Sequence, residues 1–304
     1  MQPTKQEQAG PSRRRFLASA AATGIAALAA GCGSSKIPPL LNDDDVLNFL
    51  LNLEYLEAEF YLFAATGTGL ASADTGKAPG ATTGGAKISA LTALEQSILN
   101  EIAFDEQTHV KDLRAAITKL GGTPVDKPAI DLTFFGSLAA TAGIPGTLDP
   151  FADFDSLLLG AFTLEDVGVT AYNGATSLIS NVGVGSGYLD AAIGTLPVEA
   201  YHAAYVRTTL TGRASASANY PYLGYANQIS ALRAKLGGGS ETPLTIPSSA
   251  ASATSVVPAD SNALAYTRTT DQVLHIVYGS AAVGAAKGGF FPAGVNFKFS
   301  TTTT

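Results

Sequence analysis

Cysteine and histidine are both scarce in this sequence. A single cysteine, Cys32, occurs among 304 residues, so no disulfide can form within the chain. There are three histidines, His109, His202 and His275. Charged residues make up only 14%, against 46% hydrophobic residues, a balance that allows a large core and excludes wholesale disorder. The net charge of −7 and the pI near 4.9 argue against nucleic acid as a partner.

Two of the three histidines lie in a repeated pattern. Residues 106–114 and 199–207 both read Glu-x-x-His-x4-Arg, with His109 and His202 at the matching position. On a helix, residues three apart lie on the same face, so each copy aims a carboxylate and an imidazole at one point. The chain has ten glutamates, so a Glu three residues before a given histidine arises by chance about 3% of the time. Chance is a poor explanation for two such pairs.

A second repeated element precedes each copy. It has the form Glu-x6-Tyr and occurs at Glu54 and Tyr61, and again at Glu165 and Tyr172. This order of elements, repeated once, supplies four glutamates and two histidines from four candidate helices. Such a set of ligands is typical of dinuclear carboxylate sites in four-helix bundles. The candidate metal ligands are Glu54, Glu106, His109, Glu165, Glu199 and His202.

Apolar residues spaced three and four apart predict four long helices. We expect these helices at about 43–65, 90–120, 154–179 and 188–210, within a bundle that spans residues 42–212. The connection of about 30 residues between the second and third helices is too long for a simple turn and fits a long crossover. Pro197 should kink or interrupt the fourth helix just before its Glu-x-x-His pair. The predicted fold class is all-α.

The first 31 residues resemble a twin-arginine export signal. The run Ser12–Leu17 has adjacent arginines, and the apolar stretch that follows is too short to span a membrane comfortably. The segment Leu28–Cys32 resembles a bacterial lipobox, which would make Cys32 a lipidated N-terminus and the only attachment to a membrane. Cleavage after an alanine would instead leave a soluble exported protein. We expect residues 32–41 to form a tether, and the protein to reside in the periplasm or cell envelope.

The composition of residues 213–304 differs from that of residues 42–212 and predicts a C-terminal extension of short helices and loops. We expect helices near 220–236 and 269–278, separated by a loop rich in Gly, Ser, Thr and Pro. His275 lies in this extension, and we interpret it as a packing or surface residue rather than a metal ligand.

Four segments resemble one known family. Residues 52–61 (NLEYLEAEFY) and 198–203 (VEAYHA) are similar to the first and fourth helices of exported bacterial ferritin-like proteins, the family that includes plant desiccation-related proteins. Two segments of the extension, 270–274 and 288–292, are also similar to this family, so the resemblance covers about residues 42–295. It implies a ferritin-like four-helix bundle with a dinuclear iron or manganese centre.

By this resemblance, two Fe or two Mn ions bind per chain. Glu106 and Glu199 would bridge the two metals. Glu54 and Glu165 would be terminal ligands, and each histidine would bind one metal. Four carboxylates and two neutral imidazoles carry a charge of −4, which two divalent cations neutralise. Oxygen-rich ligands suit Fe or Mn better than structural zinc, which favours thiolates. The alternative is a set of satisfied polar core residues without metal.

Three further residues are candidates for supporting the centre. Tyr61 and Tyr172 could donate hydrogen bonds near the metals or act as redox-active phenols, and simple packing of the bundle is at least as good an interpretation. Asp105 could hydrogen-bond a ligand imidazole, as metal-bound histidines usually require. The matching position in the fourth helix is Val198, so any such support is one-sided.

The other charged residues near the motifs receive structural interpretations. Arg114 and Arg207 are expected to stabilise helix C-termini and, from the rim of the bundle, to balance the negative charge of its acidic core. Glu57, Glu59 and Glu101 have no counterpart in the repeat, so we interpret them as solvated or structural.

Redox chemistry with O₂ or peroxide is the expected function. A ferroxidase-like or manganese-catalase-like activity would protect the envelope from oxidative or desiccation stress, with the metals exchanging electrons and the protein fixing the geometry. The alternative is a non-enzymatic, metal-stabilised protein that protects or scaffolds the envelope. The sequence leaves open the catalytic residues, the choice between iron and manganese, and the oligomeric state.

Overall fold

The computed structural model describes residues 41–180, 187–247 and 256–304. The predicted export signal, the tether up to residue 40 and Cys32 lie outside these residues. The described chain contains seven α-helices and little other regular structure, which confirms the all-α prediction. Among the described helices, none combines the length and the apolar character that crossing a bilayer requires.

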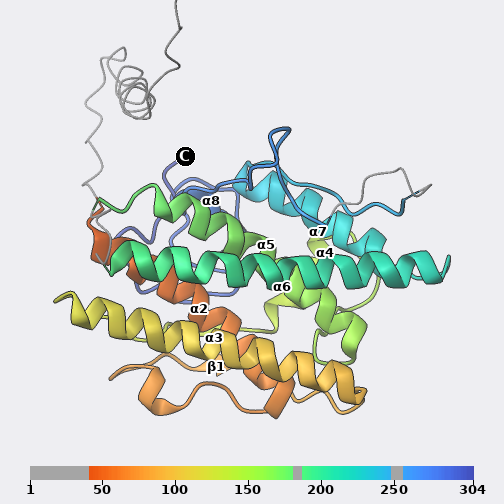
Figure 1. Cartoon of the computed structure of the whole chain (residues 1–304), viewed down its shortest axis with the longest axis horizontal. Helices are drawn as coiled ribbons and strands as arrows, with labels where there is room; N and C mark the ends of the chain where they lie inside the picture. The colour runs from red at the N-terminus through yellow and green to blue at the C-terminus, as the bar shows by residue number, and fades with distance from the viewer. Residues whose placement is uncertain (1–40, 181–186, 248–255) are drawn as a thin grey trace, which may run out of the picture. The chain divides into compact units, whose positions relative to one another are not determined.

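Four long helices form the bundle. α2 (Asp43–Thr66) packs along α3 (Ala93–Lys119), and α5 (Phe154–Thr176) packs along α6 (Tyr188–Ala216). The two pairs meet through contacts of α2 with α5 and of α3 with α6 (Figure 1). Each half of the sequence repeat therefore corresponds to one helix pair, and the predicted four-helix bundle is confirmed.

Side-chain caps determine where the bundle helices begin. Before α2, Asn42 accepts a hydrogen bond from the backbone of Asp45, and the Asp45 side chain accepts one in return. Thr92 and Glu95 form the same reciprocal pair before α3, and Asp153 caps α5. Each cap satisfies backbone donors that the first turn leaves free and contributes about 1 kcal/mol. The starting residue sets which side chains face the interior of the bundle.

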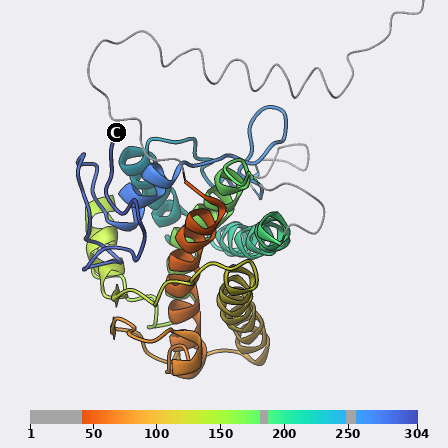
Figure 2. The ribbon, with the colours of Figure 1, turned by 90° about the vertical axis from the view of Figure 1, so that its left-hand side faces the viewer.

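The helices α2 and α5 are central. Most of their residues are buried, because α3 and α6 lie on one side of them and α4, α7 and α8 lie on the other (Figure 2). A helix covered all round is expected to be apolar on every face. The few acidic residues that α2 and α5 carry inward must therefore find partners inside the protein.

The crossover between α3 and α5 contains an additional helix, α4 (Phe134–Ala142), within the connection for which the sequence predicts no helix. Nine residues between Gly- and Pro-containing segments are too few to display a helical period. α4 forms because its apolar side chains find a core. Phe135 packs against Phe60 of α2 and against Phe290 of the C-terminal extension.

A short parallel sheet joins the loop after α2 to the same crossover. Its strands are β1 (Thr82–Thr83) and β2 (Ile130–Asp131), with Thr82 opposite Ile130. The loop before β1 also contains the 3-10 helix η2 (Ser72–Asp74). These contacts order the long Gly- and Thr-rich loop between α2 and α3 without adding a second core.

α6 continues through Pro197, so of the two predicted effects, a kink or an interruption, the interruption is wrong. Proline has no N–H to donate to the carbonyl four residues earlier, here that of Ile193. Both residues lie on the exposed face of α6, where water can satisfy this carbonyl. The helix also continues to Ala216, past its expected end near residue 210.

The C-terminal extension packs on the bundle and shares its core. It contains α7 (Tyr222–Gly237) and α8 (Thr270–Val277), close to the expected positions, and both helices contact α5. Phe290 and Phe291, which follow α8, are buried. The extension is therefore part of the same folded unit as the four bundle helices.

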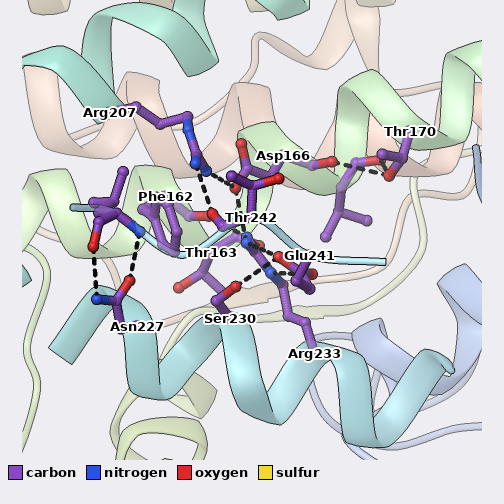
Figure 3. A network of polar contacts seen from close by, with 12 residues as sticks. Phe162, Thr163, Asp166, Thr170, Arg207, Asn227, Ser230, Arg233, Glu241 and Thr242 are labelled. Carbon is purple, nitrogen blue, oxygen red and sulfur yellow. Dashed lines mark hydrogen bonds and ion pairs between the residues drawn. The ribbon is translucent and has the colours of Figure 1, made fainter. Parts of the chain in front are cut away.

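A buried network of ion pairs joins the extension to α5 and α6 (Figure 3). Asp166 of α5 accepts from Arg207 of α6 and from Arg233 of α7, each at 2.8 Å. Glu241, which follows α7, accepts from Arg233 and Arg268. All three arginines are at most 4% exposed. The rim position expected for Arg207 is therefore wrong, because its acidic partner is buried at the junction of the bundle with the extension.

Close packing at Gly174 of α5 gives a first prediction. A Cβ there would lie 2.0 Å from the carbonyl oxygen of Arg268. Gly174→Ala should therefore displace the chain around Arg268 and lower the free energy of unfolding, measured in urea, by about 1–3 kcal/mol. Gly212→Ala in α6 is the matched control: nothing lies within 4 Å of its Cβ, so it should gain about 0.5–1 kcal/mol. A Gly174→Ala protein as stable as wild type would contradict this packing.

Candidate metal centre

All four bundle helices contribute to one buried cluster of carboxylates and imidazoles. α2 provides Glu54 and α5 provides Glu165, while α3 and α6 each provide a glutamate and the histidine one turn later. Acidic side chains are almost never fully buried without a partner. The structure thus brings together all six candidate ligands, Glu54, Glu106, His109, Glu165, Glu199 and His202, in the interior of the bundle.

The cluster divides into two groups that share Glu106. Within each group, one oxygen or nitrogen atom per residue lies within 4.8 Å of the others; the groups are Glu54, Glu106, His109 and Glu199, and Glu106, Glu165 and His202. Oε2 of Glu106 is 3.4 Å from Nδ1 of His109, and its Oε1 is 2.9 Å from Nδ1 of His202. Glu106 therefore faces both groups, as a bridging ligand must. Glu199 lies 3.4 Å from His109 and belongs to the first group.

Many polar atoms of the cluster have no hydrogen-bond partner within the described chain. They include both carboxylate oxygens of Glu106 and of Glu199 and the Nδ1 atoms of both histidines. These nitrogens lie 2.9 to 3.6 Å from carboxylate oxygens, but without the alignment of hydrogen bonds. Because buried polar atoms are nearly always satisfied, atoms that converge on two points without partners fit two cations. Carboxylates with one imidazole in each group suit Fe or Mn.

Burial shifts the carboxylates of the cluster toward the protonated form. It raises the pKa of Glu54 to about 7 and also raises the pKa values of Glu165 and Glu199. Burial alone would lower the pKa of His202, but Glu165 and Glu106 outweigh this effect and raise it to about 10. Protons therefore balance part of the charge when no cation is bound, and a bound metal would displace them.

Two tyrosines hydrogen-bond the outer glutamates crosswise. The phenol of Tyr61 on α2 donates to Glu165 on α5. The phenol of Tyr172 on α5 donates to Glu54 on α2. Burial and the adjacent carboxylates raise the pKa of both phenols well above the usual value, so both remain protonated donors. Of the roles left open by the sequence, the geometry favours hydrogen bonding to candidate ligands.

Among the described residues, a carboxylate outside the candidate ligands supports the imidazole of His202 but none supports that of His109. Nε2 of His202 lies 3.2 Å from Oδ2 of Asp105, a contact that orients the ring with Nδ1 toward Glu106. At the matching position near His109, α6 carries Val198, which has no polar atom in its side chain. The two halves of the cluster are therefore similar but not equivalent.

Two grooves between α3 and α6 reach the histidines. One has a volume of about 380 Å³ and is lined by His109 together with Asp112 and Asp190. The other has a volume of about 460 Å³ and is lined by His202 together with Glu101. Both grooves are acidic and open toward the surface, so cations and small neutral molecules can approach the cluster from this side.

An arginine in each half binds the residue that follows the outer glutamate. Arg114 of α3 donates to the phenol of Tyr55 on α2. Arg207 of α6 donates to Asp166 on α5 at 2.8 Å. Each contact holds the two helices of one half together near the cluster. The arginine positions of the sequence repeat thus have equivalent roles, although their partners differ in chemistry.

Glu57 of α2, interpreted from the sequence as solvated or structural, is not solvated but buried beside the cluster. It is 3% exposed, and burial followed by repulsion from the candidate ligands raises its pKa well above the usual value. The available signal was its position one turn after Glu54, which places both on the same face of α2. By contrast, Glu59 is buried beside Lys127, and Glu101 is exposed.

A model of the ferritin-like domain family matches residues 42–212, more than half of the chain. The chain belongs to the ferritin-like family. The matched residues include α2, α3, α5 and all but the last turn of α6, and therefore all six candidate ligands. The resemblance of the sequence segments to ferritin-like proteins is therefore confirmed.

Two relatives of this ferritin-like protein have informative names. Ferritin-like catalase Nec2 of Nesocodon mauritianus is 29% identical over 269 residues, which cover 84% of this chain and 83% of that protein. Desiccation-related protein PCC13-62 of Craterostigma plantagineum is 31% identical over 250 residues, 77% of this chain and 76% of that protein. Each alignment covers more residues of this chain than the 212 that precede the C-terminal extension, so each includes part of the extension.

Proposed function

We propose that this ferritin-like protein binds two metal ions, both Fe or both Mn, and uses them to break down hydrogen peroxide. The observation that carries the proposal is the convergence of buried, unsatisfied donor atoms on two points that share Glu106. The name of the catalase relative supports peroxide as the substrate. When bound, the metal pair would supply two-electron redox chemistry, so that one peroxide is oxidised to O₂ and a second is reduced to two waters.

The side chains around the centre have separate roles in this proposal. Four carboxylates would neutralise two divalent cations, so that a buried centre of this composition has no net charge. Tyr61 and Tyr172 hold the outer glutamates in place through their hydrogen bonds. Asp105 holds the ring of His202 in the orientation that directs Nδ1 inward.

The surroundings of the cluster suit a small substrate. The grooves along α3 and α6 lead to His109 and His202, whereas the packed helices α2 and α5 close the opposite side. Peroxide is small enough to use such a route and needs no dedicated binding pocket. Exclusion of bulk water on the side of α2 and α5 keeps the carboxylates in a region where electrostatic interactions are strong.

Peroxide turnover by the metal-loaded protein is the deciding measurement. We expect two ions per chain by elemental analysis, and release of O₂ from hydrogen peroxide after loading with Mn²⁺ or Fe²⁺. Glu106→Ala should bind less than one ion per chain and lose at least about 100-fold in turnover, because even residues outside the ligand set cost 10–100-fold when changed. Lys119→Gln, an exposed change on the same helix away from both grooves, should retain both ions and full turnover.

A protein that binds two ions without releasing O₂ would contradict the enzymatic proposal. Thermal unfolding then tests the non-enzymatic alternative, for which the relative named desiccation-related protein gives a reason. A metal-stabilised protective protein would show a higher melting temperature with bound ions than without them, in the absence of any turnover.

Export to the periplasm or cell envelope is also a proposal. It rests on the residues of the segment 1–31, which lie outside the described residues. Lipidation at Cys32 and simple cleavage near it remain the two alternatives for the mature N-terminus.

A further inference from the structure

The two halves of the centre also differ at a position where a glutamate of α2 lies opposite a glycine of α5. The repeat aligns the outer glutamates and the tyrosines of α2 and α5, and Glu57 then corresponds to Gly168. The structure brings these two positions together: a Cβ on Gly168 would lie 3.2 Å from Oε1 of Glu57 and 2.2 Å from Oε2 of Glu199. Because glycine has no Cβ, both carboxylates occupy space beside α5 that any other residue would fill.

Glu57 has no compensating charge within the described part of the chain. No ion pair or hydrogen bond to its carboxylate occurs there, and Oε2 is a buried atom without a partner. Glu59, which is equally buried, has a cationic partner in Lys127. A buried carboxylate without a partner is strongly destabilising. Glu57 therefore fits a cation that these residues of the chain do not provide.

Solvent offers Glu57 little compensation. On the side of α8, it lines a cavity of about 10 Å³ together with apolar residues that include Leu53, Leu56 and Ile276. A space of this size holds at most about one water, and apolar walls give that water few partners. On the other side, Glu57 lies beside Glu199, since both carboxylates approach the Cβ position of Gly168.

We propose that Glu57 is a fifth carboxylate of the metal centre and binds the metal pair beside Glu199, in the space left by Gly168. The inference rests on the proposed function, because it requires that the six candidate ligands bind metal. With Glu57 the ligands carry a charge of −5. A pair with one divalent and one trivalent ion matches this charge better than two divalent ions.

Glu57→Gln tests the assignment, because it keeps the size of the side chain and removes only its charge. We expect the variant to bind Mn²⁺ at least about 10-fold more weakly than wild type in competition with a chelator. The metal-free variant should melt no lower than metal-free wild type, because glutamine keeps the size of the side chain and no partner of its carboxylate is lost. The midpoint potential of the loaded centre should become more positive, because the trivalent state loses a neighbouring negative charge.

Glu59→Gln is the matched control, since Glu59 is equally buried on the same helix but lies beside Lys127. Its affinity for Mn²⁺ should equal that of wild type. If Glu57→Gln also binds Mn²⁺ as tightly as wild type, Glu57 is not a ligand. If Glu57→Gln binds Mn²⁺ more weakly but keeps the midpoint potential of wild type, the proposed match between a ligand charge of −5 and one divalent plus one trivalent ion is wrong. A wild-type protein that binds no Mn²⁺ or Fe²⁺ would instead refute the proposed function itself.

Gly168→Ala tests the same arrangement from the opposite helix. The added methyl group would lie 2.2 Å from Oε2 of Glu199, so that carboxylate must move away from its position beside Glu57. We expect at least about a 10-fold loss of Mn²⁺ affinity. Gly212→Ala, which has open space around its Cβ, should bind Mn²⁺ as wild type does. Unchanged binding by Gly168→Ala would overturn the position assigned to the two carboxylates.

Discussion

Glu241→Gln should lower the free energy of unfolding by about 3–5 kcal/mol. Glu241 accepts ion pairs from Arg233 and Arg268 and is one of two acidic residues in the network that includes three buried arginines. Glutamine has the same size, but an NH2 group replaces one of the two carboxylate oxygens that accept from the arginines, so the variant removes the negative charge and one acceptor. Asp166 would then remain as the acidic partner of Arg207 and Arg233, and Arg268 would have no acidic partner among the described residues.

Urea unfolding measures this loss, with Glu95→Gln as its control. Glu95 pairs with Arg213 at 2.6 Å, but the two side chains are 17% and 36% exposed, so the change should cost no more than about 1 kcal/mol. Glutamine can also replace glutamate in the cap of α3. If Glu241→Gln and Glu95→Gln lower the free energy of unfolding equally, burial of the network does not determine how much it stabilises the fold.

The contribution of Glu241 should depend on pH with a defined sign. Burial alone would raise its pKa, but Arg233 and Arg268 outweigh that effect and lower it. A carboxyl group with a lowered pKa stabilises the fold above its unfolded pKa of about 4.3, and the contribution is lost as the pH falls through the folded pKa. The difference between wild type and Glu241→Gln should therefore be complete near neutral pH and disappear in acid.

The same network connects the C-terminal extension to the candidate metal centre. The family match ends at residue 212, so Arg207 lies within it, whereas Arg233 and Glu241 lie beyond it. Arg207 and Arg233 meet at Asp166, which directly follows the candidate ligand Glu165. The extension therefore helps to hold the turn of α5 that carries Glu165, a candidate ligand of the centre.

The features that the sequence predicted depend on residues close together in the chain. The start of α2 follows from Asn42, whose capping partner Asp45 is only three residues away. A Glu-x-x-His pair needs one helical turn to place both side chains on one face. Because this local motif occurs twice, the sequence also indicated that the two halves meet at a common site.

The features that the sequence missed depend on partners far apart in the chain. Asp166 and Arg233 are separated by 67 positions, and neither local segment indicates the other. α4 is helical because other segments cover its apolar side chains, which no short window of sequence can indicate. Glu57 was missed for a different reason: it lacks a counterpart in the repeat, and the space left by Gly168 is visible only in three dimensions.

Removing either histidine of the repeat should release both metal ions. We expect His109→Ala and His202→Ala each to retain well under one ion per chain by elemental analysis. The reason is Glu106, which lies 3.4 Å from Nδ1 of His109 and 2.9 Å from Nδ1 of His202. When one metal is lost, this shared carboxylate loses part of its compensation. Uncompensated charge in a buried site costs about 3–5 kcal/mol, enough to weaken the second ion by at least about 100-fold.

The double variant and a third histidine test whether this coupling is specific. The melting temperature of the loaded double variant should fall by less than the sum of the two single effects, because residues of one cluster are not additive. His275→Ala should keep two ions, since its ring nitrogens face the backbone carbonyls of Ser280 and Thr304. If each single variant instead keeps one tightly bound ion, the two groups are independent sites. Glu106 would then not bridge them, although it faces both.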